Sequence, residues 1–301
     1  MKNRHDLPQW LLNAVIDTRA QYNPGEKTDY SITSLIQPPM VYTLTKQHQP
    51  EEDVADALQA WLGTACHDKL EEKLKDNPRY MVEERLYHTF HIPEAPGEQK
   101  EFIVSCQLDL YDKETCELWD HKFSKLYSFT NGGKQDHEIQ LAYQAYSLKK
   151  YGYDVRSAQI AGFALDWSKT KTAFQKDYPE TLFCHTPYPM WADEDIEAWV
   201  KNQILEKEYA KLGQIRVCSK EERWSRPDVW KVYREGRKTA LRILNSEDEA
   251  ENFIAALVKP SGKEYIEKIE GEDTRCLWFC NVRDYCSYYQ EKYVDEQKKT
   301  R

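Results

Sequence analysis

Two carboxylates and an ammonium group lie within one short stretch of the chain, at Asp109, Asp120 and Lys122. The stretch around them, residues 102–123, is otherwise apolar and rich in residues that favour strands. Side chains alternate along a strand, so Asp120 and Lys122 share a face. Carboxylates that approach each other repel, and burying them is costly without a cation. A hard divalent cation such as Mg²⁺ prefers oxygen ligands, so the pattern indicates a metal site whose lysine could orient an attacking water.

A β-hairpin must bring the two acids together. Residues 112–115 form a polar turn between the two apolar runs. If the turn centres on its second and third residues, Asp109 lies opposite Leu118 and diagonally about 7 Å from Asp120. A slip of one residue in this register would separate the acids. Without a cation, the same residues would form only a salt bridge on the surface of a hairpin, so the neighbouring elements decide between the two interpretations.

A helix is expected before the hairpin, over residues 51–75. Acids occupy its first turn, and its apolar residues recur at helical spacing. His67 and Glu71 lie one turn apart on one face of this helix. A neutral imidazole ligates metals well, and a nearby acid can orient it. The alternative is an ordinary contact between two surface side chains.

A second helix is expected after the hairpin, from about Asp136 to Tyr151, with Gly152 closing it. Gln140 and Tyr143 lie one turn apart on this helix and share a face. An amide and a phenol there could hold a phosphate or fix the lysine of the hairpin through hydrogen bonds. The alternative is an ordinary helix surface with an aromatic contact in the core.

The rest of the chain mixes strands and helices around the hairpin, which indicates an α/β fold. Further strands are expected at residues 79–92, 155–167, 181–188 and 237–244, and further helices at residues 9–22, 193–212 and 245–257. The expected regions are an N-terminal extension (residues 1–30), a core (residues 31–215), and a basic, cysteine-containing C-terminal region packed on that core (residues 216–301).

The composition is typical of a globular protein. The chain has 301 residues, 40% of them hydrophobic and 31% charged, which is enough to bury a sizeable core. No apolar run approaches the ~18 residues that span a membrane, and the chain starts without an apolar signal core. We therefore expect a cytoplasmic protein without a membrane partner. A net charge of −9 argues against a surface that binds nucleic acid all over. Eight cysteines without a signal indicate reduced thiols or metal ligands rather than disulfides.

One basic segment departs from this acidic balance. Residues 216–242 carry nine Lys/Arg and four Asp/Glu, a net charge of +5. Aromatic residues are interleaved with the basic ones, a combination that can follow phosphates and stack on bases. The alternative is a solvated helix or hairpin whose lysine stems cover apolar surface. The candidate DNA-binding residues are Arg223, Trp224, Arg226, Lys231, Arg234, Arg237 and Lys238.

The order of these motifs resembles the RecB-like branch of the PD-(D/E)XK nuclease superfamily over roughly residues 31–290. The shared order is Gly-Thr-x-x-His-x-x-x-Glu at residues 63–71, a strand, an Asp, an Asp-x-Lys, and a helix with Gln and Tyr. In this order the chain is similar to phage-encoded RecB-like exonucleases and to CRISPR-associated RecB-like nucleases. The resemblance implies a restriction-endonuclease-like mixed central sheet flanked by helices, with helical N- and C-terminal additions.

The resemblance also implies an activity, the hydrolysis of DNA phosphodiester bonds with Mg²⁺ or Mn²⁺. It favours an exonuclease that acts in phage or mobile-element DNA recombination or processing. It implies that Asp109 and Asp120 are metal ligands and that His67 lies near or on the metal. Lys122 would position the attacking water and offset charge in the transition state.

The helix motif departs from the family pattern in one position. The resemblance implies that Gln140 and Tyr143 contact the substrate or the lysine. Relatives usually place the tyrosine four residues after the glutamine, and this chain has Gln144 there. Tyr146 is a further candidate for the tyrosine role.

Three cysteines near the C-terminus, Cys276, Cys280 and Cys286, resemble a ligand set of the same family. Several RecB-like nucleases hold an iron–sulfur cluster with one upstream cysteine and three near the C-terminus. Relatives place the upstream cysteine some distance before the motif histidine. Here no cysteine precedes Cys66, which stands directly beside His67 and is a poor candidate ligand, so Cys218 is the candidate fourth ligand. Four thiolates would suit an iron–sulfur cluster or Zn²⁺. The alternative is a set of free, partly buried thiols.

Two other functions stay open on these residues. One is a DNA-binding or assembly protein that has a nuclease-like fold without hydrolysis, because a fold does not fix a function. The presence of Asp109, Asp120 and Lys122 counts against it. The other is an iron–sulfur redox or sensor protein. DNA is the expected partner, and a second copy of the chain or a recombination partner protein are further candidates.

Overall fold

The structure is a computed structural model that describes residues 1–21, 28–130, 133–257 and 263–295. It contains two compact units, each built from two segments of the chain. The first unit comprises Met1–Tyr42 and Glu51–Ile215, and the second comprises Thr43–Pro50 and Arg216–Arg301. Strands and helices are mixed throughout, so the predicted α/β class with helical additions is confirmed.

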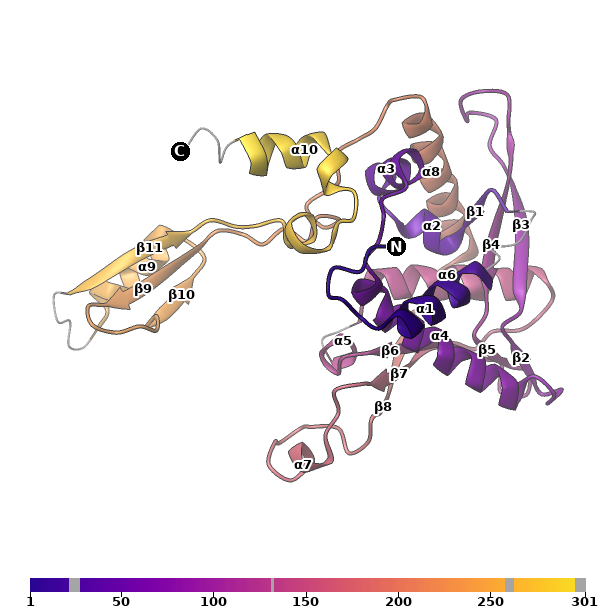
Figure 1. Ribbon diagram of the computed structural model, residues 1–301, viewed down its shortest axis with the longest axis horizontal. Helices are drawn as coiled ribbons and strands as arrows, with labels where there is room; N and C mark the ends of the chain where they lie inside the picture. The colour runs from indigo at the N-terminus through magenta and orange to yellow at the C-terminus, as the bar shows by residue number, and fades with distance from the viewer. Residues whose placement is uncertain (22–27, 131–132, 258–262, 296–301) are drawn as a thin grey trace. The chain divides into compact units, whose positions relative to one another are not determined.

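A five-stranded sheet forms the centre of the first unit (Figure 1). Its strands are β2 (Tyr80–Val82), β5 (Leu110–Asp112), β6 (Glu117–Ser124), β7 (Ser157–Ala164) and β8 (Phe183–Tyr188), in the order β2-β5-β6-β7-β8. β6 and β7 run parallel, whereas the other neighbouring strands are antiparallel. β6, the strand of Asp120 and Lys122, is therefore the middle strand of the sheet.

A second, three-stranded sheet lies in the same unit. Its strands are β1 (Tyr30–Ser31), β3 (Arg85–His91) and β4 (Glu101–Gln107), in the order β1-β4-β3. The chain leaves β4, bends at Leu108 and Asp109, and enters β5 of the other sheet. The first strand of the predicted hairpin, before the turn, is therefore divided between two sheets, and its prediction as one strand is wrong. The strand predicted over residues 79–92 is likewise divided, because Glu83 has a φ of 51° between β2 and β3.

The hairpin of β5 and β6 has a longer turn than predicted. Asp112 pairs with Glu117, which leaves four residues in the loop. The predicted pairing of Asp109 with Leu118 is therefore wrong by two residues. A shift of two residues keeps the alternation of side chains, and an extension of the observed ladder would place Asp109 level with Asp120.

The side chain of Asp112 explains the longer turn. Its Oδ1 accepts hydrogen bonds from the backbone N–H groups of Glu114 at 3.0 Å and Thr115 at 3.4 Å. The guanidinium of Arg79 pairs with the same carboxylate. Cys116, the last residue of the loop, has a φ of 57°. Cys116 therefore belongs to the turn, one residue beyond the end of the turn predicted over residues 112–115.

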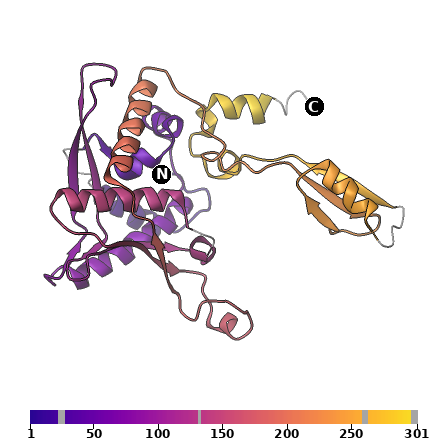
Figure 2. The same cartoon turned by 180° about the vertical axis from the view of Figure 1, so that it is seen from behind.

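Two long helices flank β6, namely α4 (Val54–Leu74) and α6 (Gln135–Lys150). Asp53 caps α4 by accepting a hydrogen bond of 3.0 Å from the N–H of Ala55. Gly152 follows the end of α6 with a φ of 87°, as the sequence predicts. α8 (Asp193–Lys211) packs on α6 (Figure 2). The shorter helices are α2 (Ile32–Ile36), α5 (Tyr127–Thr130) and α7 (Lys169–Thr172), and α3 (Pro39–His48) begins in the first unit and ends in the second.

The N-terminal segment belongs to the first unit. α1 (Gln9–Gln21) packs on α4, with Val15 completely buried between them. Trp61 of α4 donates from Nε1 to Oγ1 of Thr18 at 3.0 Å. Residue 22, the last residue of the predicted helix, lies outside the described residues. The segment predicted as an extension thus contributes to the packing of α4, the helix of His67.

The second unit has its own sheet. Its strands are β9 (Val229–Arg234), β10 (Arg242–Leu244) and β11 (Glu264–Ile269), all antiparallel in the order β10-β9-β11. α9 (Glu247–Ala255) is capped by Ser246, whose Oγ accepts a hydrogen bond of 3.1 Å from the N–H of Glu249. The predicted strand at residues 237–244 is therefore shortened to β10. Short helical turns follow over Arg275–Phe279, Arg283–Tyr285, α10 (Ser287–Tyr289) and Gln290–Asp295. Within the described parts of the chain, no helix is long and apolar enough to cross a membrane.

Candidate metal centre

Asp109 lies at the bend where the chain passes from one sheet of the first unit to the other. Its side chain is buried, and Oδ2 accepts a hydrogen bond of 2.6 Å from the backbone N–H of His121 in β6. This bond fixes the bend against the middle strand. The position of the carboxylate is therefore set by the crossing of the chain between the sheets.

His67 reaches the same place from α4. Its Nδ1 lies 3.2 Å from Oε1 of Glu83 and 3.9 Å from Oδ2 of Asp109. Glu83 stands at the break between β2 and β3, and its Oε2 accepts a hydrogen bond of 2.6 Å from Nε2 of Gln107. The carboxylate that contacts His67 is thus Glu83, whereas Glu71 lines the neighbouring cavity. An imidazole beside two carboxylates can hold a proton or ligate a metal.

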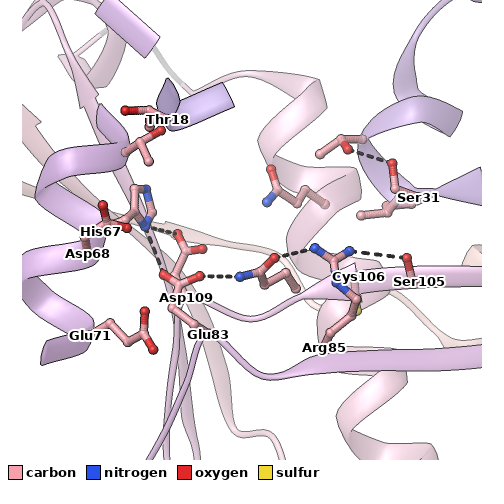
Figure 3. A pocket seen from close by; sticks show the side chains of 15 residues that line it. Thr18, Ser31, His67, Asp68, Glu71, Glu83, Arg85, Ser105, Cys106 and Asp109 are labelled. Atoms are coloured by element: carbon pink, nitrogen blue, oxygen red, sulfur yellow. Dashed lines mark hydrogen bonds and ion pairs between the residues drawn. The ribbon is translucent and has the colours of Figure 1, made fainter. Parts of the chain in front are cut away.

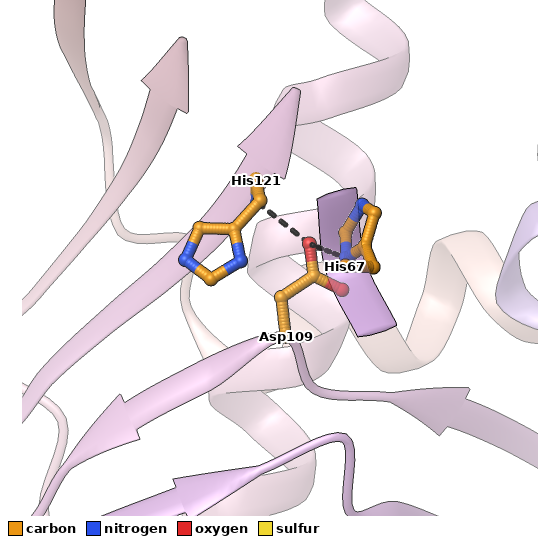
Figure 4. A group of neighbouring side chains, drawn as sticks. All are labelled: His67, Asp109 and His121. Carbon is orange, nitrogen blue, oxygen red and sulfur yellow. Dashed lines mark hydrogen bonds and ion pairs between the residues drawn. The ribbon is translucent and has the colours of Figure 1, made fainter. Parts of the chain in front are cut away.

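His121 completes a compact group of possible metal ligands (Figure 4). Each of His67, Asp109 and His121 offers one ligand atom, and the three atoms lie within 4.8 Å of one another. Nδ1 of His121 is buried and has no hydrogen-bond partner among the described residues. This is the one such group of three in the described parts of the chain.

Asp120 and Lys122 lie on β6 next to α6. Asp120 is completely buried, and its Oδ1 accepts a hydrogen bond of 2.6 Å from Nε2 of Gln140. Nζ of Lys122 forms an ion pair with Oδ2 of Asp120. The side chain of Lys122 keeps 27% of its surface exposed, so the ammonium group can still reach a bound molecule. Asp120, predicted as a metal ligand beside Asp109, thus holds the lysine and is outside the compact ligand group.

The charges of Asp109, Asp120 and Lys122 influence one another. Burial and the negative charge of Asp120 raise the pKa of Asp109 to about 7. The positive charges of Lys122 and His67 oppose this rise without cancelling it. Burial works against the charged form of Lys122, but the carboxylates of Asp120 and Asp109 outweigh it and raise the pKa of Lys122. The group therefore carries more negative charge than its lysine balances, which favours a bound cation.

The two histidines are shifted in opposite directions. Burial and the charge of His67 lower the pKa of His121 to about 4, so His121 is neutral at pH 7 and can donate a lone pair to a metal. Burial also opposes the protonation of His67, but its hydrogen bond to Glu83 and the charge of Asp109 outweigh burial and raise its pKa. A cation that binds His67 competes with a proton for the ring nitrogen, so binding should weaken as the pH falls.

A cavity of about 500 Å³ opens beside His67 and Asp109 (Figure 3). The cavity is lined by residues of α4, the break between β2 and β3, β4, and the N-terminus of α2. A second hollow of about 510 Å³ borders His67, His121 and Lys122. Both hollows therefore border His67, and the second also borders the lysine.

Tyr143 does not take part in the site. It is completely buried, and its hydroxyl donates a hydrogen bond of 3.1 Å to the carbonyl oxygen of Val104. The prediction that Tyr143 is a catalytic residue is therefore wrong, because the residue three positions after Gln140 points into the core. Gln144 is also buried and donates from Nε2 to the carbonyl oxygen of Gln107 at 2.8 Å. Of the predicted helix motif, only Gln140 contacts the site.

The four candidate cysteine ligands lie in the second unit as half-buried free thiols. Burial raises the pKa of Cys218 to about 12 and that of Cys276 to about 11, and the charges of neighbouring thiols, Cys286 among them, add to both shifts. Burial likewise raises the pKa of Cys280. A tetrahedral zinc site needs sulfur atoms about 3.8 Å apart. In the described residues no three of these sulfurs lie within 4.8 Å of one another, and a cluster or Zn²⁺ at these thiols stays a prediction.

Several predicted DNA-binding residues are already paired with acids. Nε of Arg223 lies 3.2 Å from Asp273, that of Arg234 lies 2.8 Å from Glu264, and Nη1 of Arg226 lies 3.7 Å from Glu272. These acids lie outside the basic segment, so the net charge of that segment overstates its free positive charge. Of the other candidates, Lys231 pairs with Glu267 in the sheet, and Arg237 donates a hydrogen bond to Thr239. Lys238 is exposed, and Trp224 is 48% exposed.

Two residues of the site were missed at the sequence level. Glu83 is an acid inside a run that reads as one strand, and its position at a break appears only in the structure. His121 lies between Asp120 and Lys122, and strand alternation places it on the opposite face from both. That alternation, together with a histidine on the preceding helix, is the signal that could have found it.

Comparison with known proteins identifies no family. No protein-family model matches the chain, and no curated protein matches it. Among solved structures, the chain is similar to the crystal structure of SSO0001, with 15% sequence identity, 65% of this chain and 84% of that chain covered, and a TM-score of 0.46. A likeness at this level carries no argument about activity, so the function must be argued from the site.

Proposed function

We propose that this protein is a metal-dependent nuclease that hydrolyses phosphodiester bonds in DNA. The observation that carries the proposal is the meeting of Asp109, His67 and the Asp120–Lys122 pair around one strand, β6. His67 comes from α4, and Asp109 comes from the bend before β5. His121 and Lys122 come from β6. Carboxylate, imidazole and ammonium groups in one accessible place are the parts that phosphodiester hydrolysis with a cation requires.

The residues present fit a divalent cation. Asp109 supplies a carboxylate whose raised pKa reflects burial beside Asp120 without enough positive charge. His67 and His121 add nitrogen ligands within 4.8 Å. Mg²⁺ prefers oxygen ligands, whereas Mn²⁺ also accepts imidazole, so this group fits Mn²⁺ better than Mg²⁺. When bound, such a cation stabilises negative charge on phosphate oxygens and makes water more acidic.

Lys122 is the group that would act on the reacting phosphate. Its ammonium group is positioned by Asp120, and Asp120 is positioned by Gln140. Gln140 therefore orients the lysine through an intermediate carboxylate. The raised pKa of Lys122 keeps its side chain charged at neutral pH, so it can hold an attacking water and stabilise the charge that develops on the phosphate.

Replacement of the lysine tests this function. Lys122→Ala should lower cleavage by about 10²–10³-fold, the loss typical of one removed charge-stabilising group. The measurement is a gel assay on end-labelled single- and double-stranded DNA with Mg²⁺, Mn²⁺ or EDTA. Lys125→Ala is the matched control, because Lys125 is exposed just after the end of the same strand.

Two results would contradict the proposal. A folded Lys122→Ala variant that keeps full metal-dependent cleavage would remove Lys122 from the mechanism. If the wild type binds DNA but does not cleave it with either Mg²⁺ or Mn²⁺, the result would instead support a DNA-binding protein that has a nuclease-like fold.

A further inference from the structure

The cavity beside the metal centre has two chemically different ends (Figure 3). The end near α4 is acidic apart from its histidine, with His67, Asp68, Glu71, Glu83 and Asp109. The other end has neutral hydrogen-bonding groups and one cation, namely Ser31, Thr33, Ser105, Gln107, Gln140 and Arg85. A phosphate would be repelled by the first end unless metal ions were bound there, and attracted by the second.

Arg85 is the only Lys or Arg among the described residues that line this cavity. It begins β3, directly after the break that places Glu83, and pairs in register with Gln107 of β4. None of the ion pairs between described residues includes Arg85, whereas Arg79 on the same segment pairs with Asp112. A half-buried guanidinium without a carboxylate is costly, so its charge is available for an anionic ligand.

Neutral groups hold Arg85 in place without neutralising it. Its Nη2 donates to Oε1 of Gln107, and its Nη1 lies 3.5 Å from Oγ of Ser105. The other end of the Gln107 amide donates to Glu83, which contacts His67. Figure 3 shows this line of contacts from the guanidinium to the histidine. Gln107 is therefore a positioning residue that fixes the orientation of the Arg85 guanidinium relative to Glu83 and the metal centre.

We propose that Arg85 forms a phosphate-binding subsite that holds a second phosphate of the substrate strand beside the phosphate that is cleaved. The planar fork of a guanidinium binds phosphate oxygens in pairs, and the hydroxyls of Ser31 and Ser105 offer further donors. The subsite deepens the proposed nuclease function and rests on it. Its ligand is either a terminal phosphate or an internal phosphodiester, which present the same oxygen atoms.

Three variants test the subsite. Arg85→Gln removes the charge, Arg85→Lys keeps the charge but loses the fork, and Arg156→Gln is the matched control because Arg156 is exposed. The substrates are single-stranded oligonucleotides of one sequence that end in 5′-phosphate, 5′-hydroxyl or 3′-phosphate. Arg85→Gln should lower kcat/KM by about 10- to 100-fold, mainly through KM, with Arg85→Lys between it and the wild type. Thermal melting checks that each variant is folded.

The three substrates distinguish the two sources of phosphate. If the wild type prefers one terminal phosphate and Arg85→Gln loses that preference, the subsite holds a chain end. If Arg85→Gln lowers kcat/KM equally on all three substrates, it holds an internal phosphodiester. If kcat/KM of Arg85→Gln equals that of the wild type on every substrate, the subsite does not exist.

A binding measurement separates this proposal from the nuclease assignment. Fluorescence anisotropy with a labelled oligothymidylate in EDTA needs no cleavage. A wild-type protein that cuts nothing would overturn the proposed function, yet a tenfold weaker binding by Arg85→Gln than by Arg156→Gln would still support the subsite. Equal binding by those two variants would overturn the subsite, whatever the wild type cleaves.

Discussion

Two buried aspartates, one in each compact unit, have opposite surroundings. Asp109 of the first unit is 8% exposed, and Asp273 of the second is 2% exposed. Asp109 accepts one hydrogen bond from a backbone N–H and is close enough to Asp120 to be affected by its negative charge. The carboxylate of Asp273 accepts hydrogen bonds from the side chains of Arg223, Ser225, Tyr288, Lys292 and Tyr293.

Burial opposes the ionisation of both carboxylates, but only one is compensated. At Asp273 the hydrogen bonds from Ser225, Tyr288 and its other partners outweigh burial and hold the pKa well below its usual range. At Asp109 the charge of Asp120 adds to burial and raises the pKa to about 7. A carboxylate with all its hydrogen bonds stabilises the fold around it, whereas one with too few is suited to a ligand from outside.

The largest expected effect comes from removing the charge of Asp109. Asp109→Asn should lower metal-dependent DNA cleavage by about 10³-fold, because a bound cation contributes several kcal/mol to the transition state and each ~1.4 kcal/mol is tenfold in rate. Cleavage rates with Mn²⁺ measure the loss, and the exposed Asp154→Asn is the control. Rates within tenfold of the wild type would show that Asp109 does not hold the cation.

The next effect concerns stability in the second unit. Asp273→Asn should lower the free energy of unfolding by about 3 kcal/mol, because it leaves Arg223 and Lys292 without their buried partner. Urea unfolding measures the change. Asp284→Asn is the control, since the side chain of Asp284 is 81% exposed and its replacement should change stability by less than about 0.5 kcal/mol. Equal free energies of unfolding for the two variants would mean that Asp273 and its hydrogen-bond partners do not stabilise the unit.

The smallest effect is a dependence of stability on pH. The folded pKa of Asp109, about 7, lies above the unfolded value of about 3.9, so folding takes up a proton between them. The ionised carboxylate therefore lowers the free energy of unfolding, with no effect below about pH 4 and the full effect above about pH 7. In EDTA at pH 8, Asp109→Asn should therefore be more stable than the wild type by on the order of 1–3 kcal/mol, with no difference at pH 4.

Asp273 should show the opposite sign in the same titration. Its folded pKa lies below the unfolded value, so its contribution is present above about pH 4 and is lost as the pH falls. Unfolding of wild type, Asp109→Asn and Asp273→Asn at pH 4, 6 and 8 measures both signs together. An Asp109→Asn variant that is less stable than the wild type at pH 8 would contradict the view that the charge of Asp109 destabilises the fold without a cation.

The sequence was sufficient to place Asp109, Asp120 and Lys122 around one hairpin, because strand alternation and turn composition are local signals. The register was missed because it depends on the hydrogen bonds of the Asp112 side chain, which lengthen the turn. Both bends that place Asp109 and Glu83 lie inside runs of strand-forming residues. Periodicity reports which residues favour a strand, but not where a strand leaves one sheet and joins another.

The helix motif shows a second limit of sequence reasoning. Gln140 and Tyr143 share a helix face, yet the first reaches Asp120 and the second reaches the backbone of Val104. α6 is buried along most of its length, so its apolar pattern does not indicate which residues approach the site. The pairing of Arg223 and Arg234 with distant acids was equally invisible, because those acids are brought close only by the fold.

The crossing of the chain at Leu108 and Asp109 also affects when the proposed metal centre can form. β4 must join one sheet and β5 the other before Asp109 can meet His121, and His67 must arrive on a helix from earlier in the chain. The contact of His67 with Asp109 joins residues far apart in sequence, so its formation costs loop-closure entropy. A chain with only one sheet formed would lack the ligand group. Affinity for the cation would then report that folding of the first unit is complete.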